Sequence, residues 1–169
     1  MSKAFTKDDA DVVAVVVAPR APLPAGVPNY VTPAGLASLR AELSRLLDER
    51  SASQGSREAP ERDRTRLALT MRIEALEARI ASAEIIDPHA GPQDTIRFGA
   101  TVTLRHEDGA EQRWKIVGVD EADARNGRIT FVSPLARAML GKRVGDVATV
   151  KTPHGEEELT VVALAYDHE

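Results

Sequence analysis

The sequence predicts an α+β protein, in which an N-terminal antiparallel helical hairpin is followed by a C-terminal antiparallel sheet with one short helix. Between residues 33 and 83, apolar residues recur at steps of three and four, the spacing of amphipathic helices. From residue 94 onward the spacing changes to the alternation of strands, and turn pairs such as Asp108-Gly109 separate the segments. We expect a flexible N-terminal tail over 1–28, a coiled-coil hairpin over 29–87 and a C-terminal domain over 88–169.

The tail prediction depends on four prolines, at positions 19, 22, 24 and 28, which oppose helix formation. One apolar run, Val12 to Val17, is suited to a strand. Two arrangements stay open for this run. We favour a mobile segment over a strand that pairs with an exposed edge of the sheet.

The hairpin is predicted to begin at Thr32-Pro33, because threonine is a good helix N-cap and proline is tolerated in the first helical turn. Two apolar stripes follow, separated by residues 51–60, which are rich in Ser, Gly and Pro and therefore predict a turn. Each stripe needs a partner, so the two helices are expected to bury each other. The predicted pairs are Leu36 with Ala83, Leu39 with Ile80, Leu43 with Leu76 and Leu46 with Ile73.

Beyond these pairs, Arg50 lies opposite Leu69 and only polar residues follow, so we expect the base of the hairpin to be firmer than its tip. In the alternative arrangement, both helices lie flat on their own sheet. We disfavour it because the pattern contains no third helix to cover them. The hairpin is therefore expected to project.

The C-terminal domain is predicted from short alternating strands and one capped helix. Ser133 suits the N-cap and Pro134 the first helical position, with Leu135, Ala138 and Met139 on the buried side. Strands outnumber helices, which indicates a sheet with the helix on one face. The predicted strands cover 101–104, 114–119, 129–131, 148–150 and 159–165, and the helix covers 133–140.

Composition excludes several kinds of site and partner. The chain has no Cys, which excludes disulfides, thiolate metal sites and a cysteine nucleophile, and its four His are scattered singly, so we predict no metal site. The net charge is −4 and no segment is strongly basic, which disfavours strong independent DNA binding and favours a protein partner. No run approaches the length of a membrane span, so we expect a cytoplasmic protein without membrane contact.

Four segments resemble the bacterial Gre transcript-cleavage factors. Residues 133–153 are similar to the C-terminal signature of that family, and residues 29–35 to the way its helical hairpin opens. Ile85-Ile86-Asp87 resembles the close of the hairpin, and residues 116–121 resemble a strand of the second domain. The resemblance covers most of residues 29–166, and the leader is similar to that of some GreB-like members. It implies an FKBP-like C-terminal domain and RNA polymerase as the partner.

The resemblance also implies a docking surface. In the family, the loop and the start of this short helix dock on a coiled coil at the rim of the polymerase's secondary channel. The candidate contact residues are therefore Ser133, Pro134, Leu135 and Arg137. The residue before the serine is polar in familiar members and is Val132 here, which changes the contact from a hydrogen bond to an apolar one.

The hairpin tip departs from the family pattern. Cleavage-competent members carry paired acids there, in a Gly-Asp-x-Ser-Glu-Asn-Ala-Glu-Tyr-like stretch that helps to hold a second Mg²⁺ in the polymerase active site. This chain has residues 54–64 instead, in a shorter hairpin. Its acids are interleaved with arginines that would pair with them and offset the negative field. The candidate catalytic acids are Glu58, Glu61 and Asp63, and the candidate tip contacts are Arg57, Arg62 and Arg64.

Two functions stay open. The preferred one is a monomeric Gre-like factor that binds polymerase and regulates elongation without strong transcript cleavage, with its arginines near the 3′ end of the RNA. The alternative is a true cleavage stimulator, in which Glu58 and Glu61 share the Mg²⁺ of the polymerase. In both, the chain has no cofactor of its own and is at most an accessory to the polymerase's hydrolytic activity. A peptidyl-prolyl isomerase is disfavoured because Phe98, Trp114, Phe131 and Tyr166 are too few and too scattered for an aromatic pocket.

Overall fold

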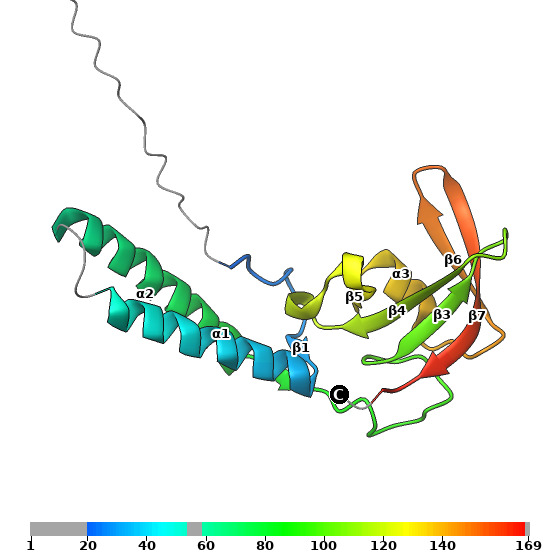
Figure 1. Cartoon of the computed structure of the whole chain (residues 1–169). Helices are drawn as coiled ribbons and strands as arrows, with labels where there is room; N and C mark the ends of the chain where they lie inside the picture. The colour runs from blue at the N-terminus through cyan, green and yellow to red at the C-terminus, as the bar shows by residue number, and fades with distance from the viewer. Residues whose placement is uncertain (1–19, 54–58, 168–169) are drawn as a thin grey trace, which may run out of the picture.

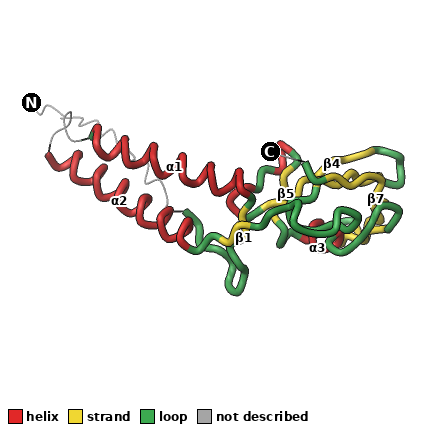
Figure 2. Tube along the Cα trace, turned by 90° about the horizontal axis from the view of Figure 1, so that it is seen from below, coloured by secondary structure: helices red, strands yellow, loops and turns green. Residues whose placement is uncertain are grey.

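Two long helices project together from one end of a curled sheet (Figure 1). The computed structural model describes residues 20–53 and 59–167. Helix α1 spans Pro33–Ala52 and helix α2 spans Ala59–Ala81, and they lie side by side in both views (Figures 1 and 2). At 1.5 Å per residue, α1 is about 30 Å long. The predicted α+β class and the projecting hairpin are confirmed.

An apolar seam holds the two helices together. Every residue of the predicted stripes lies in this cluster, and Val31 and Leu47 join it. Burying each large aliphatic side chain contributes about 1.5–3 kcal/mol, so the seam accounts for most of the stability of the pair. Its buried members are Val31, Leu36, Leu39, Leu46, Leu69, Ile73 and Leu76, and Leu43, Leu47, Ile80 and Ala83 pack against them.

Two short strands close the base of the hairpin. Strand β1, Tyr30–Val31, pairs in parallel with β2, Glu84–Ile85. The Glu84 N–H donates to the Asn29 carbonyl at 2.8 Å, and the Ile86 N–H donates to the Val31 carbonyl at 3.0 Å. These bonds fix the point where the chain enters and leaves the hairpin.

The C-terminal part is a five-stranded sheet in the order β5-β4-β3-β7-β6. Pairs β3–β4, β3–β7 and β6–β7 are antiparallel, as predicted, but β5 runs parallel to β4, so the sheet is mixed. A parallel neighbour needs a crossover rather than a tight turn, and two 3₁₀ turns supply it. The strands are β3 Thr101–Arg105, β4 Glu111–Val117, β5 Arg128–Thr130, β6 Val147–Thr152 and β7 Gly155–Ala165, and the turns are η1 Val119–Glu121 and η2 Ala124–Asn126.

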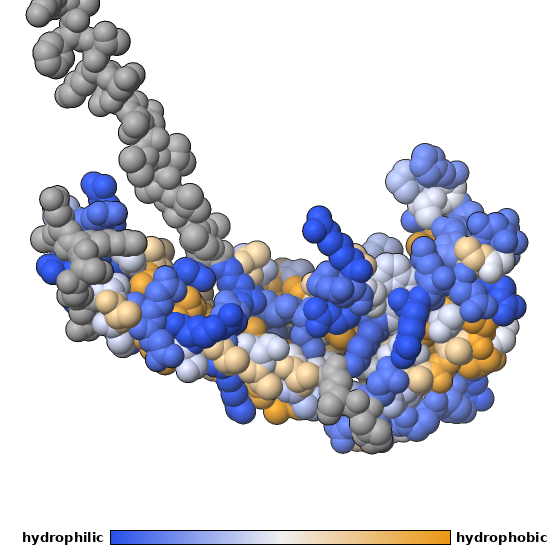
Figure 3. Space-filling view, viewed as in Figure 1, coloured by the Kyte–Doolittle hydropathy of each residue, from blue (hydrophilic) through white to orange (hydrophobic). Residues whose placement is uncertain are grey.

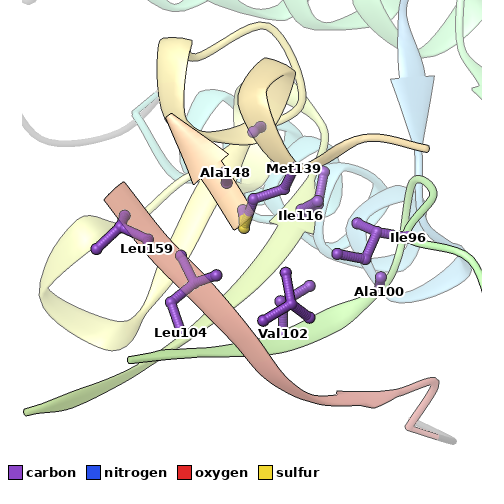
Figure 4. Close-up of a cluster of buried hydrophobic side chains, with 10 residues drawn as sticks. Ile96, Ala100, Val102, Leu104, Ile116, Met139, Ala148 and Leu159 are labelled. Carbon is purple, nitrogen blue, oxygen red and sulfur yellow. The ribbon is translucent and has the colours of Figure 1, made fainter. Parts of the chain in front are cut away.

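Helix α3, Pro134–Met139, packs on one face of this sheet. Met139 lies beside Ile116 and Ala148 in the core (Figure 4). The structure differs from the sequence prediction on the inner side of α3. Ala136 and Met139 are fully buried, whereas Leu135 and Ala138 are half-buried.

The chain enters the hairpin through residues that make long-range contacts. Nη1 of Arg20 lies 2.6 Å from Oδ1 of Asp120, and Arg20 also pairs with Glu42 of α1. The predicted flexible tail ran to residue 28, but Arg20 is bonded to α1 and to the η1 turn. Ion pairs between residues far apart in the sequence leave no local pattern from which to predict them. The strand candidate Val12 to Val17 lies outside the described residues.

Hydrophilic side chains dominate the visible face of the molecule, and apolar ones appear there as separate groups (Figure 3). In the described part of the chain, no helix combines the length and the apolar character that crossing a bilayer requires.

Candidate functional site

The start of α3 is capped as the sequence predicts. Ser133 has extended backbone angles, and its hydroxyl oxygen accepts a hydrogen bond from the Ala136 N–H at 3.1 Å. Pro134 occupies the first helical position, where its missing N–H leaves no bond unmade. The cap matters for so short a helix, because it satisfies a backbone donor that has no partner within the helix.

The four predicted docking residues divide into two roles. Pro134 and Arg137 are exposed, and their i, i+3 spacing places them on one face of α3. Ser133 and Leu135 are half-buried: Ser133 caps the helix, and Leu135 packs against the sheet core. The exposed side chains at the start of α3 are therefore a proline and an arginine on one face of the helix.

Three aromatic rings support the loop before α3. The Phe131 ring lies 5.3 Å from the Tyr30 ring and 5.7 Å from the Phe98 ring, between ring centroids. Tyr30 and Phe98 are 6.0 Å apart. Sequence reasoning treated Phe98 and Phe131 as scattered, and no local signal links them to Tyr30. Their contact connects the loop before α3 to the base of the hairpin.

Exposed apolar residues follow α3 along the chain. Leu140 ends α3, and Val144 and Val147 lead into β6; the three are 37%, 55% and 42% exposed. Sequence reasoning did not single them out. The signal available was the presence of branched apolar residues in a glycine-rich turn region, where solvent exposure is expected.

The tip residues are only partly described. Arg57 and Glu58 lie outside the described residues. Glu61, Asp63 and Arg64 are exposed at the start of α2 and Arg62 is half-buried. Within the described chain these four side chains form no ion pair with one another.

A hollow lies between the outer ends of the two helices. Its volume is about 320 Å³, and Ser53, Arg62, Asp63 and Arg66 line it. Three of these side chains are charged, and two of them are arginines, so the hollow favours an anion over a cation. Arg62 and Arg66 are four residues apart and therefore lie on the same face of α2.

The described acids at the tip do not suit a shared metal ion. Glu61 and Asp63 are two positions apart on α2, and residues at this spacing point away from each other. Among the residues that the structure describes, no group of three or more His, Asp or Glu is arranged to hold a metal. Mg²⁺ requires several converging oxygen ligands, so Glu61 and Asp63 do not fit it as a pair.

Comparison with known proteins identifies the family. Residues 91–166 match the family model "Transcription elongation factor, GreA/GreB, C-term". The transcription elongation factor GreB of Neisseria meningitidis serogroup B is 36% identical over 154 residues, which are 82% of this chain and 94% of that protein. The GreB of Pseudomonas aeruginosa is 37% identical over 161 residues, 87% of this chain and 95% of that protein. The chain belongs to the GreA/GreB family.

The GreA/GreB family model spans the region that carries α3. Ser133, Pro134, Leu135 and Arg137 therefore lie within the matched residues, whereas the hairpin tip lies outside them. Among solved structures, GreA factor homolog 1 of Thermus thermophilus is 26% identical, with coverage of 80% of this chain and 97% of that chain and a TM-score of 0.39. By the family of its GreB relatives, this GreA/GreB protein is a transcription elongation factor.

Proposed function

We propose that this GreA/GreB protein binds RNA polymerase at the rim of its secondary channel and regulates elongation without strongly stimulating transcript cleavage. The observation that carries the proposal is the contrast between the two ends of the molecule. One end presents Pro134 and Arg137 on a capped helix, and the other is a projecting hairpin whose described acids do not converge. The protein has no cofactor of its own and acts as a monomer in the cytoplasm.

Docking on the rim is supported by the rigidity of the α3 surface. Pro134 is a preorganised apolar contact, and Arg137 has a planar guanidinium that binds carboxylates in two places. Both are exposed, while the half-buried Leu135 packs against the sheet core and holds the helix in place. The Pro134 ring loses almost no side-chain entropy on binding, which favours recognition by a small area.

The tip is proposed to contact phosphate rather than metal. Arg62, Arg64 and the undescribed Arg57 would meet phosphates near the 3′ end of the RNA or of an incoming nucleotide. Guanidinium groups bind phosphate oxygens through paired, charge-assisted hydrogen bonds. The hollow lined by Arg62, Arg66 and Ser53 is a candidate binding site for such an anion.

Weak cleavage activity is proposed because a second Mg²⁺ needs carboxylates at close range. Glu61 and Asp63 face different directions on α2. The competing hypothesis uses Glu58 together with Glu61 and makes the protein a cleavage stimulator that shares the Mg²⁺ of the polymerase. Both hypotheses leave the chemistry to the polymerase.

The deciding experiment uses stalled elongation complexes made with purified polymerase. Bound protein and released 3′ RNA fragments are scored in the same reaction. We expect binding with little or no fragment release above the polymerase alone. Strong fragment release that is lost in Glu58→Ala/Glu61→Ala would instead select the cleavage stimulator, and absence of binding would remove both hypotheses.

Matched variants separate the two ends of the protein. Arg137→Glu should weaken polymerase binding, whereas Arg125→Glu, at an exposed arginine of η2, should not. Arg62→Glu/Arg64→Glu should leave binding intact but reduce the effect on elongation rate. Arg40→Glu, an exposed site on α1, is the control for charge on the hairpin. An elongation rate insensitive to the tip variant would overturn the proposed role of the arginines.

A further inference from the structure

We propose that Asp120 and Glu121 are positioning residues that fix the direction of the hairpin relative to the sheet. Both belong to η1, the turn that follows β4. The contacts that position the hairpin exist within the free protein. Their consequence for transcription rests on the proposed function. Glu121 binds the start of α1, and Asp120 binds the end of α2.

Glu121 binds the N-terminus of α1. Its Oε2 accepts hydrogen bonds from the backbone N–H of Thr32 at 3.0 Å and of Gly118 at 3.2 Å. Its Oε1 accepts from the Thr32 hydroxyl at 2.5 Å, and the Thr32 hydroxyl oxygen accepts from the Gly35 N–H at 2.9 Å. A helix N-terminus has unpaired N–H groups and a partial positive charge, so a carboxylate is favourable there.

Two glycines make room for the Glu121 side chain. A Cβ atom on Gly35 would lie 2.1 Å from Cδ of Glu121. A Cβ atom on Gly118 would lie 2.3 Å from the Tyr30 carbonyl oxygen and 2.8 Å from Oε2 of Glu121. A Cβ atom does not come this close to another heavy atom in real proteins. The start of α1 can therefore lie against the Glu121 carboxylate only because residues 35 and 118 are glycines.

Asp120 binds the other helix, also at the base of the hairpin. Its Oδ2 lies 2.9 Å from Nη1 of Arg79, in the last turn of α2, and both side chains are 8% exposed. Its Oδ1 lies 2.6 Å from Nη1 of Arg20. Nη2 of Arg79 also donates to the Ala21 carbonyl at 2.5 Å. Removing one partner of a buried pair leaves an unpaired buried charge, which is strongly unfavourable.

Two ion pairs also hold the N-terminal segment at Arg20. Burial works against the charged guanidinium of Arg20, but its hydrogen bonds to Asp120 and Glu42 outweigh this and raise the Arg20 pKa. Arg20 bridges η1 to α1 through these two ion pairs. Asp120 is therefore linked to α1 through Arg20 and to α2 through Arg79.

Two attachment points on two helices prevent a pivot that one point would permit. The arm is about 30 Å long, so a rotation of about 20° at its base would move the tip by roughly 10 Å. The contacts of Tyr30 with Phe131 and Phe98 keep the hairpin attached even without the acids, but a single aromatic cluster does not define an angle. Loss of either acid should therefore change the direction of the hairpin relative to the sheet without preventing the protein from folding.

The test measures distances between the two parts of the full chain. The protein has no Cys, so spin labels on Ser44→Cys in α1 and Thr149→Cys in β6 are unique, and both sites are exposed. Pulsed electron paramagnetic resonance should give a narrow distance distribution for the parent. Glu121→Ala and Asp120→Asn should each broaden it at least twofold.

Two controls separate positioning from general damage. Glu121→Gln can keep its oxygen on the two N–H groups and donate to the Thr32 hydroxyl, so its distribution should stay narrow. Asp123→Ala should also leave it narrow, because Asp123 bonds to Asn126 and Arg128 and to neither helix. If Glu121→Ala does not fold, the isosteric Asp120→Asn decides the question. Parent widths in the folded acid variants would overturn the inference.

An elongation assay on the same variants separates this inference from the proposed function. We expect Asp120→Asn to bind polymerase through α3 as the parent does, with at least a fivefold smaller effect on elongation. Broadened distances with no elongation effect from the parent itself would remove the proposed function and leave the positioning intact. Unchanged distances would remove the positioning whatever the elongation result.

Discussion

The ring of Tyr30 lies 5.3 Å from the ring of Phe131, although one belongs to the strand that opens the hairpin and the other to the loop before α3. Phe98 completes the cluster from the loop before β3. The base of the arm and the candidate docking loop therefore share one apolar contact. A substitution of Phe131 should therefore affect both the base of the hairpin and the loop before α3.

Phe131→Ala is expected to lower the free energy of unfolding by about 2 kcal/mol, below the usual range for a buried phenylalanine because the ring is half-buried. Urea unfolding followed by Trp114 fluorescence measures the loss. Phe131→Leu, which keeps most of the apolar volume, should lose less than half as much. An alanine variant as stable as the parent would show that the ring contact contributes nothing.

Ser133→Ala should destabilise the protein by about 1 kcal/mol, the usual effect of losing an N-cap side chain. It should also weaken polymerase binding, because α3 is six residues long and depends on its cap. Ser133→Thr keeps a hydroxyl that can accept from the Ala136 N–H, so its stability should be close to that of the parent. Equal stability of the alanine and threonine variants would contradict the role of the cap.

The hairpin was predictable because its signals are local. Spacing of three and four placed residues such as Leu39 and Ile73 in one seam, and the caps at Thr32 and Ser133 follow from residue type and position. Strand alternation likewise located the five strands of the sheet. Each of these signals lies within one or two helical turns or a few strand residues.

The junction was not predictable because its contacts join distant positions. Glu121 and Thr32 are 89 residues apart, and Asp120 and Arg79 are 41 apart. Nothing in the spacing of single residues shows which carboxylate meets which donor. The parallel pairing of β5 was missed because the short segment between β4 and β5, with its Asn126-Gly127 pair, has the local pattern of a hairpin turn and not of a crossover. At the tip, the roles of Glu58 and Arg57 remain predictions.

Stability is expected to fall as the pH rises from about 6 to 8, in part through His106. The Glu157 carboxylate, 2.5 Å from Nδ1 of His106, raises the pKa of the imidazole above 6.5, against a smaller opposing effect of burial. Gln112 and Asp108 act in the same direction as Glu157. Because the folded state holds the proton more tightly, this stabilisation is complete below the unfolded pKa and is lost as the pH rises through the folded one.

Urea unfolding at a series of pH values measures the effect. His106→Gln should show a smaller loss of stability over this range than the parent. His154→Gln is the control, because His154 is an exposed histidine in the turn between β6 and β7. Parallel pH profiles for the parent and His106→Gln would show that the Glu157 contact does not hold a proton.

Gly35→Ala tests the fit between α1 and Glu121 by the sign of its effect. In a helix, alanine is favoured over glycine by about 1 kcal/mol, so propensity alone predicts a more stable protein. The new Cβ atom would lie 2.1 Å from Cδ of Glu121 and would displace the carboxylate from Thr32. Lost hydrogen bonds to a charged group cost about 1.5–3 kcal/mol each, so we expect a net loss of stability.

The same substitution should reverse its sign when the carboxylate is absent. In a Glu121→Ala background nothing obstructs the Cβ atom of residue 35 on that side, and Gly35→Ala should then be neutral or stabilising. A double-mutant cycle, measured by urea unfolding, gives the coupling between the two positions. If Gly35→Ala changes stability equally in both backgrounds, the two residues are not coupled, and the close packing of α1 against Glu121 does not exist in solution.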